Sequence, residues 1–152
     1  MTTMTEQATQ VYAVFIRATP EQVWDAITKP EFTTKYFFGT KIDSSFEPGA
    51  PYLSVAGSDT LVEGEILESE APRLLKHTWH ALYDPEQASE SFSRVTWEIE
   101  PQDGGVTKLT VTHDQLEAAP KTAESVAGGW SFVLSGLKTL LETGEPLSTS
   151  GM

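Results

Sequence analysis

Two histidines of this sequence occupy positions where the surrounding pattern favours apolar side chains. In the segment KLTVTHDQL, polar and apolar residues alternate, so His113 shares one side of a predicted strand with Leu109 and Val111. His77 lies in the same way within RLLKHTWHALY. An imidazole titrates near neutral pH and can serve as a hydrogen-bond partner, a general base or a metal ligand. The sequence thus places two chemically versatile side chains on the inner face of a predicted sheet.

These two histidines allow three interpretations. Buried polar groups find hydrogen-bond partners, so both can be core residues bonded to a backbone carbonyl or to water. They can instead be the polar anchors of a ligand pocket with apolar and aromatic walls. A metal site needs three or four ligands, and no third one is evident near them, so we expect none. The third histidine, His80, alternates to the opposite side, where we expect solvent.

Aromatic residues accompany the two histidines on the predicted inner surface. Trp79 and Trp97 reach it from two strands, and Trp130 lies on the apolar side of the last helix, directly after Gly128 and Gly129. The two glycines indicate a need for space, a bend or a close backbone approach beside Trp130, unless the regular helix begins only near that residue. We predict a ligand site of eight residues. They are His77, Trp79, Trp97, His113, Trp130, Leu134, Tyr36 and Phe38.

The sequence contains no complete catalytic constellation. Ser131 and Ser135 lack a nucleophile-elbow motif, and no segment has the glycine pattern of a phosphate-binding loop. His113 could act as a general base, but its neighbour Asp114 faces the other side of the strand and cannot orient it. The catalytic residues therefore stay unknown, and no cofactor is expected. Enzyme activity stays open, with a non-enzymatic role favoured.

The composition limits the partners of the chain. Its 152 residues suit one domain, and the net charge of -12 opposes binding to nucleic acid and to anionic membranes. There is no cysteine, which excludes disulfides and thiolate sites. The start, MTTMTEQATQ, lacks the segments of a signal peptide, and no run reaches the ~18 apolar residues of a membrane span. We expect a cytoplasmic protein.

The elements that must position these residues follow a simple order. Residues 11–18 predict a strand, which a short helix capped by Thr19 follows, and a second short helix spans about residues 30–36. Six strands without a crossover then fill residues 40–116. A long amphipathic helix over residues 122–143 comes last. This order predicts an α+β domain whose sheet curls around the final helix.

Four motifs in this order resemble the START/birch-pollen-allergen (SRPBCC) superfamily, in the branch named after the activator of the heat-shock protein 90 ATPase. They are ATPEQVWDAITKPE, PRLLKHTW, SRVTWEIEPQDGGVTKLTVTHDQL, and GGW followed by LKTLLETGEPL. The resemblance implies a helix-grip fold: a seven-stranded, curved antiparallel sheet around a long C-terminal helix, two short helices after strand 1, and a hydrophobic cavity between sheet and helix. The segments KYFFG and EPGAPY depart from the family pattern, so the details of the cavity mouth are not carried over.

We predict one domain over residues 11–147, with disordered tails at residues 1–10 and 148–152. The function that we favour for this domain is the binding of a small hydrophobic or aromatic molecule in an internal cavity. One alternative is a small-molecule enzyme of the cyclase or hydrolase type that uses His113. The other is a protein-partner module like the chaperone regulator that names the branch. Both a monomer and a homodimer fit these functions.

Overall fold

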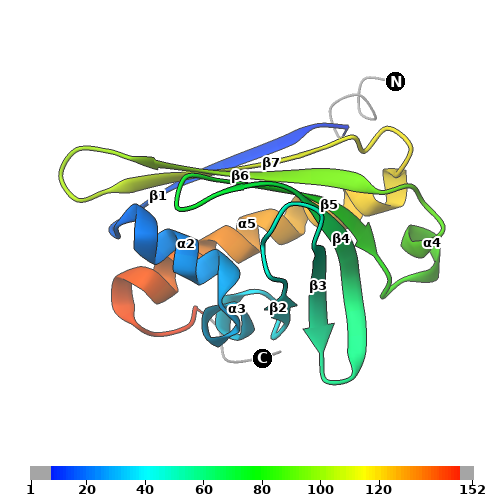
Figure 1. Cartoon of the computed structure of the whole chain (residues 1–152), viewed down its shortest axis with the longest axis horizontal. Helices are drawn as coiled ribbons and strands as arrows, with labels where there is room; N and C mark the ends of the chain where they lie inside the picture. The colour runs from blue at the N-terminus through cyan, green and yellow to red at the C-terminus, as the bar shows by residue number, and fades with distance from the viewer. Residues whose placement is uncertain (1–7, 148–152) are drawn as a thin grey trace.

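A seven-stranded antiparallel sheet forms the frame of the fold, with its strands in the order β1-β7-β6-β5-β4-β3-β2 (Figure 1). The computed structural model describes residues 8–147. The strands are β1 (Gln10–Ile16), β2 (Lys41–Asp43), β3 (Pro51–Ala56), β4 (Asp59–Glu70), β5 (Leu74–Ala81), β6 (Ser93–Pro101) and β7 (Thr107–Asp114). Strands β2 to β7 pair successively, and β1 pairs with β7. The predicted helix-grip fold is confirmed.

The helices within the described residues are α2 (Pro20–Thr28), α3 (Pro30–Tyr36), α4 (Pro85–Ala88) and α5 (Pro120–Thr143). Helix α2 begins as predicted, because the Thr19 hydroxyl accepts a hydrogen bond from the Gln22 amide at 3.1 Å and the Gln22 side chain accepts one from the Thr19 amide at 2.8 Å. Helix α4 was not predicted, since four residues are too few to show a helical period.

Helix α5 begins two residues before its predicted start at residue 122. Its N-cap residue, Ala119, has no capping side chain. Glu90, from the connection between β5 and β6, takes that role: its carboxylate accepts hydrogen bonds from the backbone amides of Lys121 and Thr122 at 2.8 and 2.9 Å. A carboxylate at a helix N-terminus satisfies free N–H groups and complements the helix dipole. The start of α5 is therefore fixed by a residue distant in sequence.

The concave side of the sheet holds α5, with α2 and α3 at one end of it (Figure 1). The predicted inner face of this helix is buried throughout, namely Val126, Trp130, Val133, Leu137 and Leu140. The alternation predicted for β5, β6 and β7 is also confirmed, and His77 and His113 are both fully buried. The sheet and α5 thus enclose a core that is rich in tryptophan and histidine.

His80 lies on the outer side of β5 as predicted, but it is not a solvated side chain. Its Nδ1 lies 2.8 Å from a carboxylate oxygen of Glu63, and its Nε2 lies 2.9 Å from the carbonyl oxygen of Ala88 in α4. The imidazole also stacks on Phe92, with ring centroids 4.4 Å apart. The prediction of a solvated surface residue was wrong because α4 and its flanks cover this part of β5.

The two predicted tails fall largely outside the described residues. Residues 1–7 and 148–152 are not described, whereas Gln10 is the first residue of β1.

Candidate functional site

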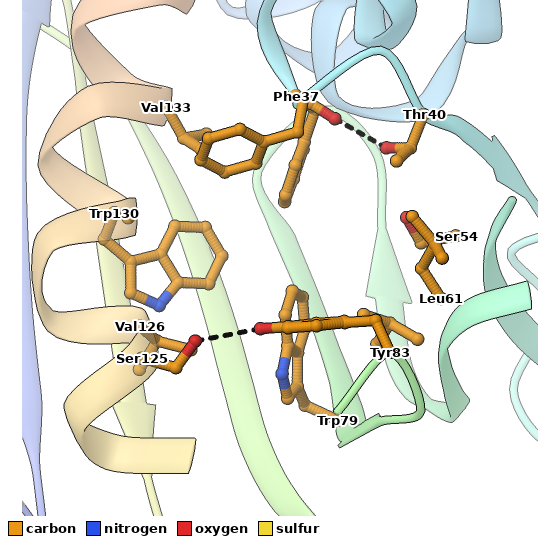
Figure 2. A pocket seen from close by; sticks show the side chains of 13 residues that line it. Phe37, Thr40, Ser54, Leu61, Trp79, Tyr83, Ser125, Val126, Trp130 and Val133 are labelled. Carbon is orange, nitrogen blue, oxygen red and sulfur yellow. Dashed lines mark hydrogen bonds between the residues drawn. The ribbon is translucent and has the colours of Figure 1, made fainter. Parts of the chain in front are cut away.

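A cavity of about 310 Å³ lies between α5 and the sheet, where the connection after α3 also reaches it (Figure 2). This volume is at the low end of the ~300–1,000 Å³ range of small-molecule sites. The residues that line it are Phe37, Phe38, Thr40, Ser54, Leu61, Val62, Trp79, Tyr83, Ser125, Val126, Gly129, Trp130 and Val133. None of these side chains is charged. The cavity is therefore a mainly apolar and aromatic space with a few hydroxyl groups.

The tight turn after α3 supplies one end of the cavity wall. Helix α3 ends at Tyr36, and the next residues turn sharply because Phe38 and Gly39 both have positive φ, at 54° and 72°. As a result Phe37 points into the core and packs against Trp79 and Trp130, with ring centroids 6.4 and 5.9 Å apart. Phe38 stays about half exposed at the rim.

Two tryptophans of the core donate hydrogen bonds to the two buried histidines. Trp97 Nε1 lies 3.0 Å from His77 Nε2, and Trp130 Nε1 lies 3.0 Å from His113 Nδ1. An indole nitrogen can only donate, so each of these imidazole nitrogens must be unprotonated. The other ring nitrogen then carries the proton: in His77 it donates to the Thr78 carbonyl at 2.9 Å. Both imidazoles are therefore neutral acceptors for an indole.

His113 is also bonded on its second nitrogen. Its Nε2 donates to the hydroxyl of Ser93 at 2.7 Å, and that hydroxyl donates in turn to the Trp79 carbonyl at 3.3 Å. Burial and, to a smaller extent, the neighbouring His77 lower the pKa of His113 to about 3. Burial likewise lowers the pKa of His77 to about 4. Neither side chain has a free nitrogen for a reacting molecule, and the geometry does not favour His113 as a general base.

Two glycines of α5 lie in open space next to the cavity. The helix runs through Gly128 and Gly129, so the alternative prediction of a start near Trp130 is wrong. Apart from the adjacent residues and the nearby backbone of the helix itself, no atom lies within 4 Å of the position that a Cβ would take at either glycine. Gly129 lines the cavity, whereas Gly128 is exposed to solvent. The absence of a side chain at Gly129 therefore leaves space in the cavity.

The mouth of the cavity is bridged by one hydrogen bond. The hydroxyl of Tyr83, which follows β5, lies 2.9 Å from the hydroxyl of Ser125 on α5 (Figure 2). Tyr83 is half exposed, so this bond lies near solvent. The same connection carries Glu90, which caps α5. The mouth is thus formed by two elements that already bind each other.

The predicted site residues divide into two groups. Trp79, Trp130 and Phe38 line the cavity. The other five do not line it; they are buried behind its wall and are His77, Trp97, His113, Leu134 and Tyr36. Trp97 packs on two residues of the cavity wall, Phe37 and Trp130, at centroid distances of 6.4 and 5.4 Å. Their part in binding stays a prediction.

Several lining residues were not predicted from the sequence. Phe37 and Tyr83 lie in connections, where no period indicates which side chain turns inward. Ser54 could have been found, because the alternation of PYLSVA places it on the same side as Tyr52, which is buried. Ser125 lies one residue outside the apolar face that was assigned to the last helix.

Within residues 8–147, no three side chains of histidine, aspartate or glutamate come close enough to hold a metal ion. No helix in that same part of the chain combines the length and the apolar character needed to cross a membrane.

Comparison with known families and structures agrees with the predicted resemblance. The family model of activator of Hsp90 ATPase homolog 1-like proteins matches residues 17–142. No curated protein matches the sequence. Together with the structural neighbours, the family match confirms the predicted branch of the SRPBCC superfamily.

Three solved structures illustrate the likeness of the fold. DynU16, a protein of the dynemicin biosynthetic locus, has a TM-score of 0.75 at 22% identity, and the match covers 91% of this chain but 49% of DynU16. MLL2253 from Mesorhizobium loti has a TM-score of 0.72 at 25% identity, over 88% of this chain and 96% of that one. PFC0360w, an HSP90 activator from Plasmodium falciparum, has a TM-score of 0.71 at 20% identity, over 91% and 98%.

Proposed function

The chain belongs to the family of activator of Hsp90 ATPase homolog 1-like proteins, and we propose that it binds a small, mainly apolar or aromatic molecule in the cavity between α5 and the sheet. The observation that carries this proposal is the cavity itself, a space of about 310 Å³ with Phe37, Trp79 and Trp130 in its wall. Apolar walls with a few hydroxyl groups are typical of sites for small molecules.

The glycines of α5 support this proposal in a second way. A glycine inside a helix costs about 1 kcal/mol relative to alanine. At Gly129 a side chain would meet no steric obstacle, yet it would extend into the cavity. A glycine at position 129 thus lowers the stability of the helix but leaves space that a ligand could fill.

A thermal-shift screen of small aromatic and aliphatic molecules tests the proposal. A ligand at a hundred times its Kd stabilises the folded state by about 2.7 kcal/mol, which corresponds to roughly 5–11 °C for a domain of this size. The informative variants are Gly129→Leu, which fills the cavity, and Gly128→Leu, which adds the same side chain on the solvent side. Native mass spectrometry of the purified protein would identify molecules that copurify with it.

The two leucine variants should differ in binding and agree in folding. Both remove a glycine from the same helix, so both should melt at or above the temperature of the wild-type protein. Only Gly129→Leu should lose the shift that ligands produce. If both variants bind as the wild-type protein does, or if no molecule in the screen binds, the cavity does not have this function.

A second candidate function is contact with a chaperone ATPase, which an exposed aromatic pair favours. Phe38 and Phe132 stack with ring centroids 5.7 Å apart, although they are 53% and 45% exposed. Exposed aromatic side chains are enriched in protein interfaces. Addition of the chain to a purified Hsp90 should then raise the rate of ATP hydrolysis, and Phe132→Ser should remove the effect. An unchanged rate with the wild-type chain excludes this candidate.

A further inference from the structure

One hydroxyl on the cavity wall belongs to a buried residue and forms no hydrogen bond with the described residues. Ser54, on β3, is 3% exposed and lines the cavity, and its Oγ forms no hydrogen bond with any of the residues described. In Figure 2 the Ser54 oxygen points from its strand toward the cavity. Buried polar groups in folded proteins nearly always have a partner. The partner of Ser54 must therefore come from what the cavity holds.

The other hydroxyl groups of the cavity wall are already engaged. The hydroxyl of Thr40 donates to the Phe37 carbonyl at 2.7 Å. The hydroxyls of Tyr83 and Ser125 bind each other at 2.9 Å. Among the lining residues, Ser54 thus carries the hydroxyl that is free both to donate and to accept.

The backbone of β3 is irregular at the same position. Ser54 pairs with Val62 of β4, but the next residue, Val55, pairs with Thr60, so the register shifts directly after Ser54. Such bulges redirect side chains and occur next to functional sites. Ser54 follows Tyr52 on the inner side of the strand, where a valine would have filled the space without needing a partner.

The cavity offers no partner for a charge. None of its lining side chains is ionisable to a cation or a carboxylate, and His113, which lies behind Trp130, is bonded as a neutral imidazole. An ionised group that is buried without a counter-charge loses its hydration and gains little in return. A ligand whose polar group lies inside this cavity should therefore be uncharged.

This reasoning rests on the proposed function and adds the chemical class of the ligand. We propose that Ser54 selects an uncharged molecule that carries a hydroxyl or carbonyl group on an otherwise apolar frame, and that this oxygen forms a hydrogen bond with the Ser54 hydroxyl. Ser54 then determines specificity in the cavity together with Trp79, a lining residue whose buried Nε1 also has no hydrogen-bond partner among the described residues.

Three probes with the same ring system separate the polar contact from apolar burial. They are 2-naphthol, 2-methylnaphthalene and 2-naphthoate, which carry a hydroxyl, a methyl group of similar size and a carboxylate. Their Kd values are measured by isothermal titration calorimetry at pH 7 on the wild-type protein, Ser54→Ala, Ser54→Thr and the control Ser131→Ala. Ser131 is an exposed serine of α5.

The ratio of the Kd of 2-naphthol to that of 2-methylnaphthalene is the decisive quantity. In Ser54→Ala this ratio should rise roughly threefold to tenfold, because only 2-naphthol loses a hydrogen-bond partner. In Ser54→Thr, which keeps a hydroxyl, and in Ser131→Ala it should stay as in the wild-type protein. The anionic 2-naphthoate should bind at least about tenfold more weakly than 2-naphthol.

The possible failures are distinguishable. An unchanged ratio in Ser54→Ala, with both neutral probes bound, overturns the role of Ser54 and leaves the proposed function intact. Equal affinity for 2-naphthoate and 2-naphthol overturns the choice of an uncharged ligand, and this comparison needs only the wild-type protein if Ser54→Ala does not fold. If no probe binds to the wild-type protein, both this inference and a cavity for aromatic molecules are wrong.

Discussion

Replacement of His113 by phenylalanine measures the contribution of one buried indole–imidazole hydrogen bond. His113 Nδ1 accepts the hydrogen bond of Trp130 Nε1 at 3.0 Å, and both side chains are buried. Phenylalanine keeps most of the volume but leaves the Trp130 N–H without an acceptor. An unpaired buried donor costs about 1–3 kcal/mol. Since 1 kcal/mol shifts the melting temperature of a domain of this size by roughly 2–4 °C, we expect a fall of about 2–12 °C.

Urea denaturation of His113→Phe, Trp130→Phe and the double variant completes this experiment. The double variant has lost both partners, so its loss of stability should be smaller than the sum of the two single losses by about 0.5–1.5 kcal/mol. A His113→Phe protein that is as stable as the wild type, yet binds polar ligands more weakly, would refute the reasoning and identify His113 as an anchor of the ligand site. Additive losses would refute the pairing of His113 with Trp130.

The remaining predictions concern stability at low pH and the close approach of β4 and β5 at Gly64. Burial lowers the pKa of His77 to about 4 and of His113 to about 3, from 6.5, so the unfolded chain takes up protons first as the pH falls. Above about pH 6.5 both imidazoles are neutral in the folded and the unfolded chain, and at pH 5 each histidine should lower the free energy of unfolding by about 2 kcal/mol. Urea denaturation at pH 7 and at pH 5 measures this loss. If His113→Phe loses as much stability between these pH values as the wild-type protein does, the prediction for His113 is wrong. A Cβ at Gly64 would collide with the carbonyl oxygen of Thr78, so Gly64→Ala should lower the free energy of unfolding by about 1–3 kcal/mol. Gly128→Ala, where the added Cβ meets open space, should raise it by up to about 1 kcal/mol. Equal melting temperatures of the two variants would disprove this.

The fold could be predicted because its signals are local and periodic. Alternation in β5, β6 and β7 identified the inner face, including His77 and His113, since each strand is buried on one side. The capping box at Thr19 fixed the start of α2. The start of α5 was placed two residues late because its cap, Glu90, comes from another part of the chain and leaves no local signal.

The candidate site was only partly predictable, because burial on the inner face does not determine contact with the cavity. Trp79 and Trp97 alternate inward in the same way, but Trp79 lines the cavity and Trp97 does not. Phe37, which also lines the cavity, comes from the turn after α3. That turn depends on the positive φ values at Phe38 and Gly39, which no hydrophobic period encodes. Whether an inward residue meets another ring or open space is decided by such distant segments.

The connection between β5 and β6 is hydrogen-bonded to the start of α5 at two places. Glu90 holds the amides of Lys121 and Thr122, and Tyr83 of the same connection binds Ser125 one turn further along the helix. A movement of the whole connection away from α5 would break both sets of hydrogen bonds. We therefore expect opening of this side of the cavity to be coupled to fraying of the helix start, and hydrogen exchange of the backbone amides of Lys121 and Thr122 would report the free energy of that opening.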